Sequence, residues 1–194
     1  MHTLILDIGG IFFSPEWRMR GIAEMADAIG CSQAFFLEAL ELQKKQFYCG
    51  KISEDEYWLS VQEYCHSTWG AAQYAKAYRS YVTPISASVA LLPRLSQYNI
   101  LMSCNNSPKE WMDERVAMCH LQNFFTQFYT SGYVGHKKPS EHMFSAVFDH
   151  AQRLEHPIVY IDDNMSYLDA ASRLYPQHTY IHYTKPDDLL RWVR

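Results

Sequence analysis

Carboxylate, amide and thiol side chains stand at the ends of three short apolar segments of this sequence. The first segment ends at Asp7, and the other two end at Cys104-Asn105 and at Asp162-Asp163. If these segments are parallel strands, the groups at their carboxyl ends meet at one edge of a sheet. Three carboxylates brought together there would repel one another unless a cation neutralised them. Oxygen ligands without a His or Cys cluster favour Mg²⁺ over zinc, so the sequence predicts a magnesium site.

A lysine stands where it could complement these carboxylates. Lys138 precedes Pro139, which we expect to lie in the first turn of a helix that ends near Arg153. A helix that begins between two strands can face the same edge of the sheet as the carboxylates. The ammonium group of Lys138 would then offset part of their negative charge and attract a phosphate group.

The order of the expected elements indicates an α/β fold. Residues 3–6 form a short apolar run, and strands are also predicted at 100–104, 125–130, 158–161 and 179–182. A helix is predicted before each of the later strands, over 87–97, 109–119, 139–153 and 165–174. This alternation favours a Rossmann-like, mostly parallel sheet with helices on both faces.

A helical pattern fills the segment between the first two predicted strands. Apolar residues recur at helical spacing from Ile22 to Ile29 and over about 35–47, and Ser53 with Glu56 has the capping-box pattern of a helix start. An insertion at this point would lie above the carboxyl edge of the sheet, where ligands bind in such folds. We therefore predict a core of residues 1–14 and 83–194 and a small all-helical cap domain of residues 15–82.

Composition and charge narrow the class of partner. Seventeen basic and twenty-one acidic residues give a net charge of -4 without a dense basic run, so a nucleic-acid partner is not expected. No apolar run approaches the roughly 20 residues that span a bilayer, and the first residues lack the features of a signal peptide. The five cysteines have no CxxC spacing, which fits a reducing compartment. We expect a cytoplasmic protein without a membrane partner.

Four segments resemble, in order, the motifs of the haloacid dehalogenase-like (HAD) hydrolase superfamily. They are residues 4–11 around Asp7, residues 100–107, residues 131–139 with Lys138 before proline, and residues 159–164 with the acidic pair. The resemblance extends from about residue 3 to 183 and includes the stretch 50–53, which is similar to helical caps of this group. It implies a Mg²⁺-dependent phosphatase in which Asp7 attacks phosphorus to form an aspartyl-phosphate that water then hydrolyses.

The resemblance also implies roles for the other residues. Mg²⁺ would be held by Asp7, the backbone carbonyl of Gly9, and Asp163 with or without Asp162. Lys138 would bind the phosphate and the Asp7 carboxylate. In addition, the group that follows the second strand, Cys104-Asn105, would donate hydrogen bonds to the phosphoryl oxygens.

The sequence departs from the family pattern at two positions. Gly9 stands where many related phosphatases carry a second Asp as general acid/base, a role that is worth roughly 10²–10⁴-fold in rate. Cys104 stands where Ser or Thr is usual. Ser103 is one residue early, and strand alternation should turn it to the other face, so we favour Cys104 as the site residue. These departures keep open a catalytically weakened or inactive HAD-like binding protein.

A further alternative concerns the reaction. A haloacid dehalogenase-type hydrolase uses the same nucleophile without metal. The acidic pair Asp162-Asp163 argues against this alternative, because that reaction does not need the charge of the pair.

A cap over the site favours a small phosphorylated metabolite over a macromolecule. The aromatic residues of segment 12–17 would either line the substrate pocket or pack the cap against the core.

Overall fold

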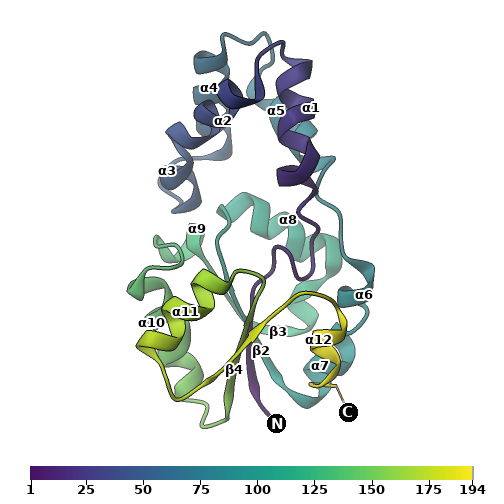
Figure 1. Ribbon diagram of the computed structural model, residues 1–194, viewed down its shortest axis with the longest axis vertical. Coiled ribbons are helices and arrows are strands. Elements are labelled where there is room, and N and C mark those ends of the chain that lie inside the picture. The colour runs from purple at the N-terminus through teal and green to yellow at the C-terminus, as the bar shows by residue number, and fades with distance from the viewer. Residues whose placement is uncertain (194) are drawn as a thin grey trace.

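A five-stranded parallel sheet forms the centre of the structure, which is a computed structural model that describes residues 1–193 (Figure 1). The strand order is β3-β2-β1-β4-β5, and every neighbouring pair is parallel. The strands are β1 (Thr3–Leu6), β2 (Ile100–Asn105), β3 (Phe125–Thr130), β4 (Ile158–Asp162) and β5 (Thr179–His182). The first strand lies in the middle because crossover connections extend to both sides of it. This arrangement confirms the predicted α/β fold.

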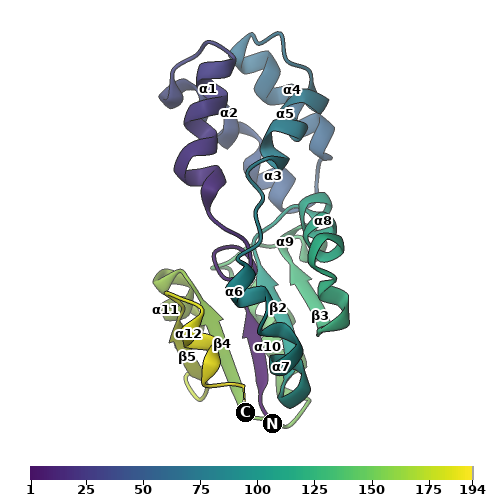
Figure 2. The same ribbon diagram turned by 90° about the vertical axis from the view of Figure 1, so that its right-hand side faces the viewer.

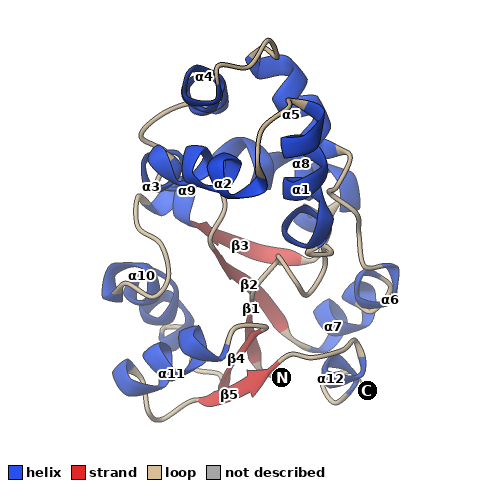
Figure 3. Ribbon diagram, turned by 45° about the horizontal axis from the view of Figure 1, so that its top comes forward, coloured by secondary structure: helices blue, strands red, loops and turns tan. Residues whose placement is uncertain are grey.

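Helices cover both faces of the sheet (Figure 3). They are α6 (Ser86–Val89), α7 (Leu92–Tyr98), α8 (Lys109–Cys119), η2 (Leu121–Asn123), α9 (Ser131–Val134), α10 (Glu141–Gln152), α11 (Met165–Leu174) and α12 (Asp187–Leu190). Along β1, Leu4 and Leu6 pack in the cluster that includes α7, α8 and α12, whereas Ile5 packs in the cluster that includes α10 and α11. Because both faces are covered, the central strand β1 is buried along its whole length, as expected in a parallel sheet.

The chain between β1 and β2 forms a group of helices above the carboxyl ends of the strands (Figures 1 and 2). These are η1 (Trp17–Gly21), α1 (Ile22–Ala28), α2 (Gln33–Leu42), α3 (Lys44–Tyr48), α4 (Glu54–Cys65) and α5 (Ala71–Arg79). They enclose their own aromatic cluster, in which Trp58 and Tyr74 stack with ring centroids 5.5 Å apart. The predicted capping box begins α4: Glu56 N–H donates to Ser53 Oγ at 3.3 Å, and Ser53 N–H donates to the Glu56 carboxylate at 2.7 Å. The all-helical cap is confirmed.

Three predicted helices have different limits in the structure. The helix expected from Pro139 begins at Glu141, because Ser140 caps it and the proline therefore precedes the cap. The helix expected over 87–97 is interrupted, and Pro93 lies in the first turn of its second part, α7, where the missing N–H of proline costs no hydrogen bond. The pattern over 35–47 forms α2 and α3 in place of one helix.

One side chain of the core lies inside the aromatic cluster of the cap. Trp111 of α8 stacks on Tyr78 of α5 with ring centroids 3.8 Å apart, and its indole N–H donates to Glu54 at 2.8 Å. Glu54 also pairs with Arg79 at 2.7 Å, and the same guanidinium pairs with Glu114 of α8. The cap is thus joined to α8 by packing and by a shared network of charges.

Replacing Trp111 by Ala is expected to lower the free energy of unfolding by about 3–5 kcal/mol, because a large buried ring is lost and Glu54 loses a donor. Urea denaturation measures this change. Met118 lies on the same helix with 49% of its surface exposed, so Met118→Ala should stay within about 0.5 kcal/mol of the parent protein. Equal losses in the two variants would show that Trp111 does not hold the cap.

Candidate active site

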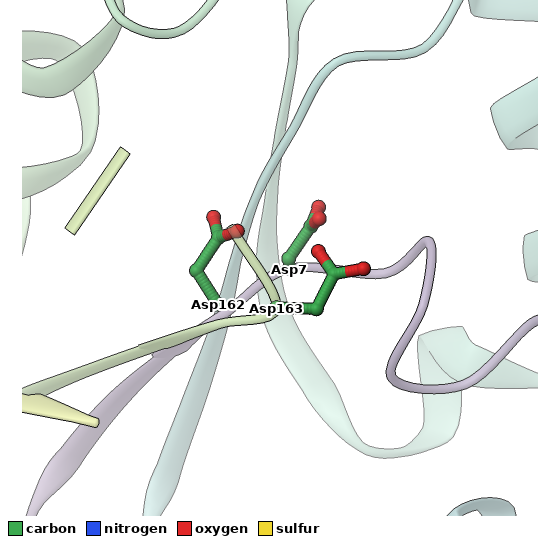
Figure 4. Close-up of side chains that lie close together, drawn as sticks. All are labelled: Asp7, Asp162 and Asp163. Atoms are coloured by element: carbon green, nitrogen blue, oxygen red, sulfur yellow. The ribbon is translucent and has the colours of Figure 1, made fainter. Parts of the chain in front are cut away.

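The carboxylates of Asp7, Asp162 and Asp163 meet at the carboxyl edge of the sheet and point toward a common space (Figure 4). Asp7 directly follows β1, and the acidic pair lies at the end of β4, which pairs with β1 through Leu6 and Ile161. One oxygen from each carboxylate lies within 4.8 Å of the other two. Parallel pairing of adjacent strands produces this convergence, since the three residues follow the last pair between β1 and β4, Leu6 with Ile161.

Lys138 is fully buried against two of these carboxylates. Its Nζ lies 2.7 Å from Asp162 Oδ2 and 3.2 Å from Asp7 Oδ1. Burial alone would lower the pKa of the Lys138 ammonium group, but attraction by the two carboxylates raises it, so the group stays protonated. Asn106 fixes the backbone of this lysine: its Oδ1 accepts from the Lys138 N–H at 2.7 Å, and its Nδ2 donates to the Lys138 carbonyl at 3.0 Å. The loop after β2 therefore positions the lysine.

The two adjacent acids differ in their surroundings. Asp162 is fully buried and accepts from the Lys138 ammonium, from the hydroxyl of Tyr160 and, at 2.9 Å, from the N–H of Asn164. Asp163 is exposed and lines a cavity, and its carboxylate accepts no hydrogen bond from another residue within 1–193. Asp163 is therefore available to a ligand, whereas Asp162 would have to share an oxygen that already accepts.

The charges of this cluster suit a divalent cation. Lys138 offsets one of three carboxylate charges, which leaves two negative charges when all are ionised. Burial raises the pKa of Asp7 to about 7; Lys138 opposes this rise, and Asp162 and Asp163 add to it. A divalent cation among these oxygens would keep all three ionised. The donor set consists of hard oxygens, which suits Mg²⁺.

Two adjacent glycines differ in how the site constrains them. Gly10 has φ +77°, and a Cβ there would lie 2.0 Å from Asp163 Oδ2, so only glycine lets this carboxylate approach the loop. At Gly9, which lines the cavity, an added Cβ would meet no atom within 4 Å. A Cβ at position 9 therefore fits without displacing a neighbouring atom.

Cys104 and Ser103, the two candidates near the end of β2, lie on opposite faces of the sheet. Cys104 is fully buried in the cluster of α10 and does not line the cavity; burial raises the pKa of its thiol to about 12. Ser103 faces the other side, as strand alternation predicts, where its Oγ accepts from Tyr129 N–H at 3.0 Å. Asn105 lines the cavity, although its Oδ1 accepts from the Thr130 hydroxyl at 2.9 Å. The roles of Cys104 and Asn105 in binding phosphate remain predictions.

A cavity of about 110 Å³ lies between the carboxylate cluster and the cap. Its lining from the cap side comprises Pro15, Trp17, Arg18, Tyr48 and Tyr78, and Arg115 of α8 also contributes. Of the aromatic residues in segment 12–17, Trp17 lines the cavity, while Phe12 and Phe13 are buried in the sheet core. The positions of Tyr48, Tyr78 and Arg115 at the cavity could not be predicted from the sequence, because no local pattern distinguishes them from other residues of their helices.

The fold and the site define a capped Rossmann-like α/β protein with an acidic, lysine-containing edge. The sequence profile of the haloacid dehalogenase-like hydrolase family matches residues 30–177. Since this match covers most of the chain, the protein belongs to that family, and the predicted membership is confirmed. A comparison with curated protein sequences gave no match. Among the helices of residues 1–193, none is both long and apolar enough to cross a membrane.

Solved structures of similar fold include other members of this family. One is a HAD family enzyme from Bacteroides thetaiotaomicron in complex with magnesium, with TM-score 0.80, 19% identity and coverage of 95% of this chain and 93% of that one. The same enzyme is known with magnesium and inorganic phosphate, with TM-score 0.70, 16% identity and coverage of 95% and 94%. A predicted HAD-like hydrolase from Porphyromonas gingivalis gives TM-score 0.73, 21% identity and coverage of 94% and 90%.

Proposed function

We propose that this protein is a Mg²⁺-dependent phosphatase that acts on a small phosphorylated metabolite through an aspartyl-phosphate intermediate. The observation that carries the proposal is the position of Lys138, within 3.2 Å of Asp7 and 2.7 Å of Asp162 beside the third carboxylate. A nucleophile, an anion-binding cation and oxygen ligands for a metal thus occupy one space. The Bacteroides enzyme that was crystallised with magnesium and inorganic phosphate supports this choice of chemistry.

The proposed metal ligands are Asp7, the backbone carbonyl of Gly9, and Asp163. Asp162 can join them only by sharing an oxygen, and its main part would be to orient Lys138. When bound, Mg²⁺ would supply positive charge that reduces the repulsion between the Asp7 carboxylate and an incoming phosphate dianion.

In the proposed first step, a carboxylate oxygen of Asp7 forms a bond to phosphorus while the bond from phosphorus to the ester oxygen breaks. The substrate leaves as an alcohol after its oxygen takes a proton. Lys138 would hold the phosphoryl oxygens in line, together with the loop after β2, where Asn106 and Ser107 line the cavity. The thiol of Cys104 is proposed to donate a hydrogen bond to a phosphoryl oxygen. It is buried close enough to Lys138 for the lysine charge to oppose the rise in the pKa of the thiol.

In the second step, water forms a bond to phosphorus and the bond to the Asp7 oxygen breaks, which releases inorganic phosphate and restores the carboxylate. Gly9 has no side chain that can donate a proton to the leaving group or take one from the water. Both proton transfers would therefore depend on solvent in the cavity, and esters with good leaving groups should react fastest.

The first experiment measures phosphate release from a panel of small phosphomonoesters, with p-nitrophenyl phosphate as a substrate that has a good leaving group. Turnover is expected with Mg²⁺ and is expected to be lost in EDTA, because the three carboxylates then keep their mutual repulsion. Turnover that persists in EDTA would exclude the metal-dependent mechanism. A folded protein that binds Mg²⁺ but releases no phosphate would favour the inactive binding protein.

A further inference from the structure

The cap-facing wall of the cavity carries an arginine whose charge is not neutralised. Arg115 is half-buried, and its guanidinium donates to the Ser107 hydroxyl at 3.1 Å and to the Tyr78 hydroxyl at 2.9 Å. Its Nε–H is buried without a hydrogen-bond partner. No salt bridge to Arg115 occurs within residues 1–193, although a charge removed from water is normally paired.

A second arginine reaches the same wall. Arg18, from η1 of the cap, lines the cavity, and its side chain makes no hydrogen bond or salt bridge in the described part of the chain. It lies near the acidic cluster: burial and Asp162 raise the pKa of Asp163, while Lys138 and Arg18 oppose that rise. Arg18 thus brings a positive charge on a long side chain to the cavity wall, near the acidic floor that Asp7, Asp162 and Asp163 form.

The two arginines line the same cavity as the Tyr48 hydroxyl. Burial raises the pKa of the Tyr48 hydroxyl, and Lys44, Arg18 and Arg115 all oppose this rise. Arg18 and Arg115 therefore lie within electrostatic reach of the same hydroxyl, although they come from the cap and from α8. Lys138, by contrast, is paired with the carboxylates of Asp7 and Asp162. The cavity has an anion-binding group at its floor and a second cationic region at its wall.

We propose that Arg115 and Arg18 form a subsite for a carboxylate of the substrate, so that the protein hydrolyses a small phosphomonoester that also carries a carboxylate. This inference rests on the proposed phosphatase function. The planar guanidinium fork matches a carboxylate, and neither Arg115 nor Arg18, which both line the cavity, has a carboxylate partner within residues 1–193.

The enclosed part of the cavity is small, about 110 Å³, and the cavity is partly open to solvent. A short phosphorylated acid of three or four carbon atoms could place its phosphate beside Lys138 and its carboxylate beside Arg115 and Arg18.

The test compares 3-phosphoglycerate with glycerol 3-phosphate, two esters that share a carbon chain and differ in a carboxylate. With wild-type protein and Mg²⁺, kcat/KM is expected to be about 10- to 100-fold higher for the carboxylate ester, as one charge-assisted hydrogen-bonded contact provides. Arg115→Gln should reduce this preference by at least about 10-fold, mainly by raising KM for 3-phosphoglycerate. Equal kcat/KM for both esters in active wild-type protein would overturn the subsite and leave the phosphatase function standing.

Binding is measured separately, so that loss of the proposed activity can be told apart from loss of the subsite. Calorimetry with Asp7→Asn protein and Mg²⁺ should give tighter binding of 3-phosphoglycerate than of glycerol 3-phosphate even if wild-type protein turns over neither. Equal affinities there would refute the subsite. Arg18→Gln, at an exposed position, should weaken only 3-phosphoglycerate binding. Arg173→Gln, an exposed position of α11 outside the cavity, removes the same charge and should leave both affinities unchanged.

Discussion

Replacing Asp7 by Asn is expected to lower kcat for every phosphomonoester by at least about 10⁴-fold, because the amide cannot serve as the nucleophile. The substitution keeps the size of the side chain, and Lys138 keeps its contact with Asp162 at 2.7 Å. The variant should therefore fold, with a thermal unfolding midpoint close to that of the parent protein. Steady-state phosphate release with Mg²⁺ measures the loss.

The matched control for this variant is Asp169→Asn, which removes one carboxylate from the exposed surface of α11. Its kcat should equal that of the parent protein, since Asp169 neither lines the cavity nor belongs to the acidic cluster. If the Asp7→Asn protein retained turnover within about 10-fold of the parent, Asp7 would not be the nucleophile. The proposed aspartyl-phosphate would then be excluded even if the protein remained a phosphatase.

Replacing Gly9 by Asp should increase kcat for esters of poor leaving groups by about 10²–10⁴-fold, the range that general acid/base catalysis provides. The structure allows the change, since an added Cβ would meet no atom within 4 Å and the position lines the cavity. The backbone carbonyl that is proposed as a metal ligand is retained. For p-nitrophenyl phosphate the increase should be small, because its leaving group needs no proton.

The comparison that isolates proton transfer is Gly9→Asn, which has nearly the same shape as Gly9→Asp but no carboxyl group. Rate measurements on an alkyl phosphate with the two variants give the test. If both variants gave the same rate, the absence of a carboxyl group at Gly9 would not limit the reaction. Rates below that of the parent protein in both would show that a side chain here blocks the substrate.

The sequence alone determined the class of fold and the family. The positions of β1 and β4 could be read from local apolar runs because the centre of a parallel sheet covered on both faces is buried. The limits of α8, α11, β3 and β5 agree with those predicted. Errors arose at Pro139 and Pro93, where the position of proline relative to the cap, rather than its presence, decides where a helix begins. The exact division into residues 1–14, 15–82 and 83–194 stays a prediction.

The acidic floor of the site could also be predicted, since Asp7, Asp162 and Asp163 follow strands that the fold must place side by side. The placement of Cys104 beneath the cavity, rather than in it, needed the structure, because alternation gives a face of the strand but not what covers that face. The chemical roles of these three aspartates and of Cys104 are predictions that the variants test.

Tertiary structure alone decided the wall of the cavity. Arg18, Tyr48 and Tyr78 lie on three cap segments and Arg115 on a core helix, and no spacing in the sequence relates them. They meet because the cap is held on α8, both by Trp111 in the aromatic cluster of the cap and by the ion pairs of Arg79 with Glu54 and Glu114. Local patterns report contacts within one helix or between adjacent strands, whereas a substrate wall depends on how two separately packed units meet.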